Sequence, residues 1–166
     1  MNLFFLDIDP KKCAQYHCNK HVVKMLLEIV QMLYTAHIIL KTIDLPQDHY
    51  KIAHPNHPTA VWIRTCKANY TYASQVGMFL AEEYTFRYNR VHSCEKHIIW
   101  LNNNLPKINE GFMTPIPLAM PEDSKRNNPV KSYREYYMLH KTHFAKWTKR
   151  ESPWWYTSLK RISVLF

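Results

Sequence analysis

The chain has 166 residues, of which 46% are hydrophobic and 21% charged, the size and composition of one folded domain rather than a disordered chain. It contains only two glycines and neither of the glycine-rich phosphate-binding patterns that mark Rossmann and P-loop nucleotide enzymes. Its four cysteines never occur as CxxC, which argues against a zinc ribbon or finger and indicates reduced thiols of an intracellular protein.

The net charge of +9 is distributed unevenly along the chain. Residues 1–83 hold eight Lys/Arg and seven Asp/Glu, whereas residues 84–166 hold fourteen Lys/Arg and six Asp/Glu. A basic half joined to a near-neutral half is typical of proteins that bind polyanions. We therefore expect nucleic acid, with DNA favoured over RNA, as the partner. The alternative is a solvated basic surface without a specific ligand.

The first helix is predicted to begin at Asp9-Pro10, because Asp caps a helix amino terminus and Pro is accepted at the first helical position. We expect it to run to about Lys41 and to be the central helix. The chain shows neither a basic leader nor an apolar run of membrane-spanning length. We expect a protein of the host cytoplasm, or of the nucleus in a eukaryotic host, without membrane association.

Three further segments complete the predicted fold. A second long helix is expected over residues 58–89 and a shorter one over about residues 93–102, from the helical spacing of their apolar side chains. The proline-rich residues 104–128 are predicted to form an ordered loop, and Asn128-Pro129 to open a last helix. The expected fold is one all-α domain over residues 1–166, with three to five helices.

The segment "HCNKHVVKMLLE", residues 17–28, places titratable side chains on one face of the first helix. At helical spacing His17, His21, Lys24 and Glu28 fall within a stripe roughly 80° wide, with apolar side chains around most of the rest. The stripe either faces solvent, with Lys24 and Glu28 as an ordinary i,i+4 ion pair, or lines a cleft where burial shifts pKa values. The two histidines favour the cleft.

Each residue of the stripe has a candidate catalytic role if it lines a cleft. A desolvated Lys24 could act as an amine nucleophile. Glu28 could orient Lys24, act as a general base or stabilise a developing oxocarbenium ion. His17 and His21 could move protons or hold a phosphate. We expect no cofactor and no metal site, although a metal-dependent hydrolase or oxygenase that uses the His17/His21 pair and a glutamate is an alternative.

Four residues elsewhere are candidate substrate contacts. His54 and His57 lie in the proline-stiffened segment "HPNHP", where the alternative is turn chemistry with His57 as a helix cap. Arg87 and His92 lie in "EEYTFRYNRVH", where an i,i+4 ion pair between Glu83 and Arg87 is the structural alternative.

The carboxyl-terminal region interleaves basic and aromatic side chains. The basic residues are Lys141, Lys146, Lys149, Arg150, Lys160 and Arg161, and the tryptophans between them are Trp147, Trp154 and Trp155. Because cations hold phosphates and aromatic rings stack on bases, we expect nucleic acid to bind here. The alternative places the tryptophans in the core, and at least one of Trp154 and Trp155 is expected there, since adjacent side chains point apart.

The motifs "LDIDP", "QYHCNKHVVKMLLE", "HPNHP", "EEYTFRYNRVH" and "FAKWTKR" together give a pattern that resembles, over nearly the whole chain, a family of small proteins from bacteriophages and large DNA viruses. More distantly, the layout resembles the pyrimidine-dimer DNA glycosylase/lyase family of phage T4 endonuclease V. In that family a short amino-terminal segment leads into a catalytic helix with histidine, basic residues and a glutamate. A Trp- and Tyr-rich basic carboxyl end, here "SPWWYTS", lies beside that helix.

The second resemblance implies a nucleic-acid enzyme that removes or alters a flipped-out base. The nucleophile of that family is the α-amine exposed by removal of the initiating methionine. Residue 2 here is Asn, a poor side chain for that removal, and Glu28 lies about one turn beyond the position of the family's glutamate, which Lys24 occupies. Lys24 is therefore the alternative nucleophile. A nucleic-acid-binding or host-takeover protein without catalytic activity is the alternative function.

Overall fold

The computed structural model describes residues 2–156, which contain six complete α-helices, one short 3-10 helix, a helical turn at residues 154–156 and no β-strand. In chain order the elements are α1 (Pro10–Tyr16), α2 (Asn19–Ile39), α3 (Pro58–Ile63), α4 (Lys67–Tyr88), α5 (Glu95–Asn103), the 3-10 helix η1 (Glu122–Ser124) and α6 (Pro129–His140). The prediction of a single all-α domain with a long helix near its amino terminus is confirmed. The α-helices exceed the expected three to five because two predicted helices are each broken.

The first break separates α1 from α2 within the helix predicted over residues 10–41. His17 and Cys18 have extended backbone there. The Cys18 N–H donates to the Tyr137 hydroxyl at 3.4 Å, and the Asn19 N–H donates to the Lys146 carbonyl at 2.8 Å. These distant partners satisfy backbone groups that a continuous helix would satisfy internally.

The second break separates α3 from α4 within the second long helix that the sequence predicts. Cys66 is extended, and the Asn69 side chain donates to the Trp62 carbonyl at 2.8 Å. The Lys67 N–H donates to the carbonyl of Asn109, in the proline-rich loop, at 2.8 Å. Contacts from a distant loop thus end one helix and start the next.

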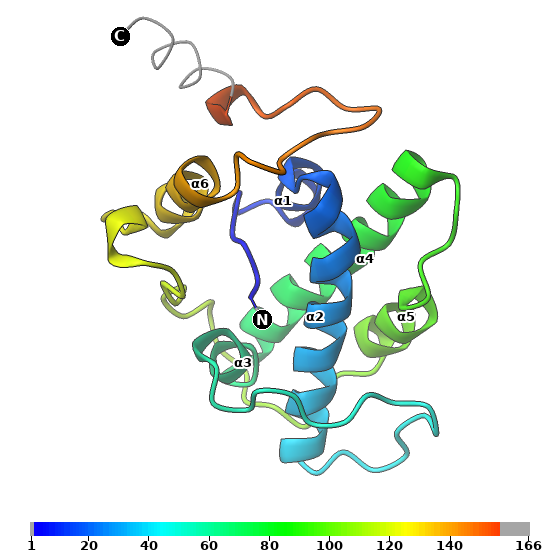
Figure 1. The fold of residues 1–166 in the computed structure, drawn as a ribbon. Helices are drawn as coiled ribbons and strands as arrows, with labels where there is room; N and C mark the ends of the chain where they lie inside the picture. The colour runs from blue at the N-terminus through cyan, green and yellow to red at the C-terminus, as the bar shows by residue number, and fades with distance from the viewer. Residues whose placement is uncertain (1, 157–166) are drawn as a thin grey trace, which may run out of the picture.

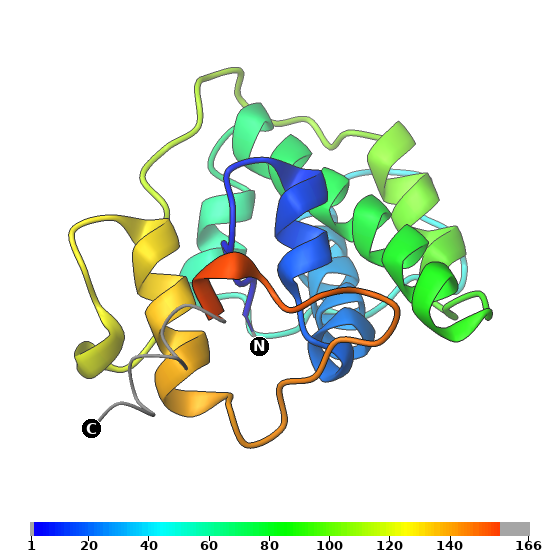
Figure 2. The same ribbon diagram turned by 90° about the horizontal axis from the view of Figure 1, so that it is seen from above.

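The central helix α2 packs against α3, α4 and α5, and α4 also packs against α1. Figure 1 shows α3 and α6 on one side of α2 and α5 on the other. Residues 2–6 form an extended segment that passes between α2 and α6 in both ribbon views (Figures 1 and 2). The Arg134 side chain of α6 fixes this segment by donating to the Leu6 carbonyl at 2.9 Å.

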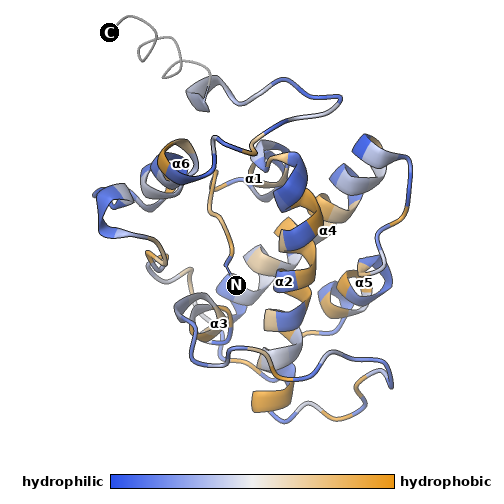
Figure 3. Cartoon of the chain, viewed as in Figure 1, coloured by the Kyte–Doolittle hydropathy of each residue, from blue (hydrophilic) through white to orange (hydrophobic). Residues whose placement is uncertain are grey.

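The sequence of α2 is largely apolar (Figure 3). By length and composition this helix could cross a membrane, contrary to the expectation that no such stretch exists. In the folded chain, however, 67% of its apolar window is buried, as in the core helix of a folded domain. Apolar side chains from the amino-terminal segment and from α1 to α6 complete one continuous core around it.

The predicted helix starts are confirmed where a polar side chain precedes proline. Asp9 caps α1 by accepting hydrogen bonds from the backbone N–H groups of Lys11 and Lys12 at 2.8 and 3.0 Å. Asn128 caps α6 by accepting one from the Lys131 N–H at 3.0 Å. These side chains satisfy N–H groups that have no partner within the helix.

The proline-rich loop between α5 and α6 packs against the helices. The indole N–H of Trp62 donates to the Thr114 carbonyl at 3.2 Å, and the Tyr133 hydroxyl donates to the Pro117 carbonyl at 2.8 Å. The Asn2 side chain donates to the Ala119 carbonyl at 2.9 Å. The loop therefore brings Ala119 against the amino-terminal segment.

Candidate functional site

A cavity of about 230 Å³ opens where the amino-terminal segment, α2, the proline-rich loop and the end of α6 meet. It is lined by Asn2, Phe4, His21, Lys24, Met25, Glu28, Ala119, Tyr136 and Lys141. Three of the four residues of the predicted stripe, His21, Lys24 and Glu28, thus face one cavity. Two other cavities lie along α4 and contain none of these residues.

The carboxylate of Glu28 is the buried acid of this cavity. Its Oε2 accepts a hydrogen bond from the backbone nitrogen of Asn2 at 2.7 Å, and its Oε1 lies 3.6 Å from the Lys24 ammonium. Asn2 is itself fixed, because its side-chain oxygen accepts from the Leu3 N–H at 2.9 Å and its amide bonds the loop. Sequence reasoning did not select Asn2 as a site residue, although the family resemblance drew attention to the nitrogen of residue 2.

Two ammonium groups border the cavity. The Lys24 side chain is 69% exposed, so the expectation of a desolvated lysine is wrong. Its i,i+4 ion pair with Glu28 is the arrangement that the solvent-facing interpretation predicted. The Lys141 ammonium lies 4.5 Å from the centre of the Tyr136 ring, a cation–π contact. Together with the Glu28 carboxylate, these two cations place two positive charges and one negative charge around the cavity.

His21 is held on several sides. Its Nδ1 lies 2.5 Å from the Tyr137 hydroxyl, and its ring stacks on Phe4 with centroids 4.6 Å apart. Burial lowers the pKa of His21 to about 3, and the charges of His17, Lys141 and Lys24 act in the same direction. The imidazole is therefore neutral at pH 7, so it does not carry the charge that phosphate binding by an imidazolium would need.

His17 does not line the cavity, contrary to its predicted place in the catalytic stripe. It caps the carboxyl end of α1, fully buried, with Nδ1 2.7 Å from the Cys13 carbonyl. Burial lowers its pKa to about 4. Because the carbonyl only accepts, Nδ1 carries the proton, and Nε2 has no hydrogen-bond partner within residues 2–156. Because the helix is broken at His17, its side chain points into the core.

The histidines of "HPNHP" also lie outside the cavity lining. The Nδ1 of His57 accepts the Thr59 N–H at 3.2 Å at the start of α3, which confirms the capping interpretation. Burial lowers the pKa of His57, the charge of His54 acts in the same direction, and the charge of Glu28 opposes them. His54 is exposed and has a positive φ of 45°.

Arg87 and His92, predicted as substrate contacts, lie outside the cavity lining and form hydrogen bonds within the protein. The buried Arg87 donates to the Glu83 carboxylate at 2.7 Å, which confirms the predicted i,i+4 ion pair. It also donates to the Gln15 carbonyl at 3.0 Å and so supports the end of α1. The Nδ1 of His92 accepts the Cys94 N–H at 3.0 Å just before α5.

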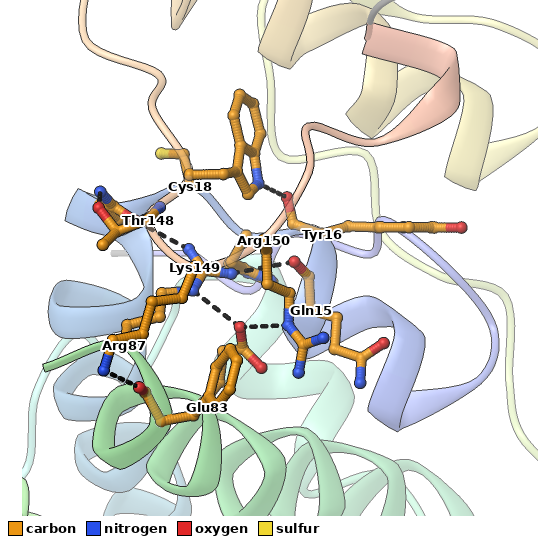
Figure 4. A network of polar contacts seen from close by, with 12 residues as sticks. Gln15, Tyr16, Cys18, Glu83, Arg87, Thr148, Lys149 and Arg150 are labelled. Carbon is orange, nitrogen blue, oxygen red and sulfur yellow. Dashed lines mark hydrogen bonds and ion pairs between the residues drawn. The ribbon is translucent and has the colours of Figure 1, made fainter. Parts of the chain in front are cut away.

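The segment 141–156 is bound to α1, α2 and α4 through polar contacts (Figure 4). Arg150 donates to the Glu83 carboxylate at 2.6 Å, and the Lys149 ammonium donates to the Phe86 carbonyl at 2.9 Å. These two cations were predicted to contact phosphates, but their polar groups hold the segment in place. The side chain of Lys146 is exposed.

The three tryptophans differ in exposure. Trp155 is buried, which confirms that one of the adjacent pair belongs to the core, and Trp147 donates its indole N–H to the Tyr16 carbonyl at 3.1 Å. The half-buried Trp147 ring also lies 4.7 Å from the Tyr156 ring, measured between centroids. Trp154 is 65% exposed and remains a candidate stacking residue. The predicted phosphate contacts Lys160 and Arg161 lie outside the described residues.

The arrangement expected for a metal-binding histidine pair is not formed. His17 and His21 lie on either side of the helix break, with ring centroids 6.4 Å apart and Nδ1 of each ring already engaged. Among residues 2–156 there is no group of three or more His, Cys, Asp or Glu side chains placed to hold a metal ion. The cavity chemistry derived from these residues is that of a carboxylate, a neutral imidazole and amines.

Comparison of the chain with protein-family models, with curated proteins and with solved structures gave no match. The resemblances described above therefore rest on the sequence patterns alone.

Proposed function

We propose that this protein is a nucleic-acid enzyme of the DNA glycosylase/lyase type and that its chemistry takes place in the Glu28 cavity. The observation that carries the proposal is the 2.7 Å contact between the backbone nitrogen of Asn2 and Glu28 Oε2. The family that the sequence distantly resembles uses a free α-amine at residue 2, near a helix with a glutamate. A free α-amine beside Glu28 requires removal of Met1, which lies outside the described residues. Because Asn at residue 2 disfavours the ordinary removal of the initiating methionine, the proposal requires a cleavage that releases Asn2.

The proposed reaction follows from this pair of groups. Glu28 accepts a proton from the α-ammonium of Asn2, which leaves a neutral amine as the nucleophile. The amine nitrogen forms a bond to C1′ of the target nucleotide while the glycosidic bond breaks. The electron pair of that bond leaves with the base, which takes up the proton that the attacking nitrogen releases. Glu28 then gives its proton to O4′ as the sugar ring opens, and the product is an imine between the α-nitrogen and C1′, which borohydride reduces to a stable amine.

The surroundings of Glu28 support a nucleic-acid substrate. Lys24 and Lys141 lie at the cavity where they can hold phosphates on either side of a flipped nucleotide. The volume of about 230 Å³ is below the range of about 300–1,000 Å³ for drug-sized ligands, and it suits a single base better than a base pair. Lys24 is the second candidate amine, but its exposure leaves it without the desolvation that would activate it.

Borohydride trapping on oligonucleotides with damaged or modified bases tests the proposal. Two forms of the protein are compared, one released by proteolysis to begin at Asn2 and one with an additional residue before Asn2. We expect a covalent adduct with the first form only, at the Asn2 nitrogen by peptide mapping. Lys24→Ala in the form that begins at Asn2 should still be trapped.

Two results would count against this assignment. Equal trapping of the two forms, with loss of trapping in the folded Lys24→Ala variant, would make Lys24 the nucleophile. Salt-sensitive binding to every oligonucleotide without any adduct would instead favour a protein that binds nucleic acid without catalysis, the function that the exposed Lys146 and Trp154 side chains would also serve.

A further inference from the structure

We propose that Tyr137 is a positioning residue that fixes His21 in the tautomer with its proton on Nε2, so that His21 offers a neutral N–H donor to a carbonyl oxygen of the flipped base. The hydrogen-bond directions that support the tautomer come from the fold alone. Only the identity of the ligand rests on the proposed function.

The Tyr137 hydroxyl contacts the backbone N–H and the thiol of Cys18 as well as the His21 ring. The Cys18 backbone N–H can only donate, and it points to the Tyr137 oxygen at 3.4 Å. Sulfur is a weak acceptor, so the imidazole nitrogen, at 2.5 Å, is the stronger acceptor for the hydroxyl proton. Burial raises the pKa of Tyr137 well above 10, so the hydroxyl keeps its proton. An Nδ1 that accepts this proton must be unprotonated, which leaves the imidazole proton on Nε2.

The surroundings of His21 keep the ring neutral and oriented. The titratable groups around it are His17 and Cys18 between α1 and α2, Lys24 and Glu28 from α2, Tyr136 and Tyr137 from α6, and Lys141 after α6. The cations and burial oppose a positive imidazolium, and Glu28, two turns away on α2, is the carboxylate of the cavity.

Ring contacts fix the plane of the imidazole. Phe4 stacks on it with an interplanar angle of 27°, and Phe144 meets it edge-on with centroids 5.3 Å apart. Phe4 also stacks on Tyr136 at 5.5 Å, so the rings form a short stack along the cavity wall. No group in the described part of the chain forms a hydrogen bond with Nε2, although His21 lines the cavity.

A fixed N–H donor selects what it contacts. A carbonyl oxygen of a pyrimidine base accepts such a bond, whereas an amino group at the same position would oppose it with a second donor. A neutral donor also binds a carbonyl without giving up a proton, as in enzymes where an imidazole polarises a carbonyl. His21 is therefore a donor that orients the base, and the proton transfers belong to Glu28 and the amine.

Nitrogen NMR of the uniformly ¹⁵N-labelled protein tests the tautomer directly. We expect the His21 Nδ1 shift of an unprotonated nitrogen and the Nε2 shift of a protonated one, unchanged between about pH 5 and about pH 8. Tyr137→Phe should produce a mixture of tautomers. The matched control is Tyr133→Phe, which removes another buried α6 hydroxyl, bonded to the Pro117 carbonyl, and should leave His21 unchanged.

A His21 ring protonated on Nδ1, or one that titrates near pH 6, would overturn the inference. So would an unchanged tautomer in a folded Tyr137→Phe variant. On a substrate that the parent protein processes, Tyr137→Phe should slow the single-turnover rate about fivefold, the equivalent of one hydrogen bond. If no substrate is trapped, the proposed function fails while the tautomer result still decides the role of Tyr137.

Discussion

At the scale of single residues, three buried histidines make the stability of this protein depend on pH. Burial lowers the pKa of His17 to about 4, of His21 to about 3 and of His37 to about 4, against an unfolded value of 6.5. The unfolded chain therefore binds more protons than the folded chain below about pH 6.5. The contribution of these neutral histidines to the folding stability is fully present above about pH 6.5 and is lost as the pH falls toward about 4.

Urea unfolding measured from about pH 7 to about pH 4 should show this loss. Each histidine should remove up to about 1.4 kcal/mol of unfolding free energy per pH unit. For His37→Gln, the slope of unfolding free energy against pH should be smaller than that of the parent by the contribution of one histidine. His37 is a suitable choice because its ring bonds Tyr70 and Thr42, away from the cavity. Identical slopes for the two proteins would show that His37 is not buried neutral.

The sequence predicts the contents of the cavity better than its geometry. Helical spacing places His21, Lys24 and Glu28 on one face, and the structure brings all three to one cavity. His17 leaves this face because contacts with distant residues break the helix beside it. The exposure of Lys24 and the position of Asn2 depend on how α6 and the amino-terminal segment pack. The periodicity of one helix gives no information about this packing.

Among the larger elements, we expect the segment 141–156 to stabilise the fold through its contacts with α1, α2 and α4. Arg150 donates to the buried Glu83 carboxylate and lies 4.7 Å from the Phe86 ring. Because Arg150→Ala leaves Glu83 with one arginine fewer, we expect a loss of about 1–3 kcal/mol in urea unfolding. Lys146→Ala, in the same segment with an exposed side chain, should change stability by less than about 0.5 kcal/mol.

Equal stability of the Arg150→Ala and Lys146→Ala variants would contradict a stabilising role of the carboxyl-terminal segment.

The predicted and observed helix boundaries show which helix signals are local. Asp9, His57 and Asn128 mark helix starts because a cap acts on the next turn of its own helix. The two helix breaks, and with them the starts of α2 and α4, depend on groups far along the chain, so the sequence predicts only the helix starts that a local cap marks.

At the scale of the whole molecule, the basic charge should reach nucleic acid through side chains that the fold leaves exposed. Lys24, Lys146 and Lys149 are exposed, but the Lys149 ammonium and the Arg150 guanidinium form hydrogen bonds with α4. Each of Lys24→Ala and Lys146→Ala should reduce the slope of log affinity against log salt by about 0.7–0.9. Fluorescence anisotropy with a labelled single-stranded oligonucleotide measures this slope.

Trp154→Ala should affect binding in a different way. Its ring is exposed, and stacking on a base releases few counterions, so affinity should fall by about 1–3 kcal/mol with little change in the salt slope. The control is Trp154→Phe, which keeps a smaller aromatic ring and should retain much of the affinity. A large change in the slope of log affinity against log salt with either variant would show that Trp154 acts by positioning basic side chains and not by stacking.

Glu28→Gln tests whether Glu28 performs the proton transfer in the cavity. Glutamine keeps an oxygen that can accept from the Asn2 nitrogen, so the folded structure should be retained, with an unchanged melting temperature. On a trapped substrate under single-turnover conditions, we predict a rate about 10²–10⁴-fold below that of the parent, with similar oligonucleotide affinity. A folded Glu28→Gln variant that reacts at the parental rate would contradict the account.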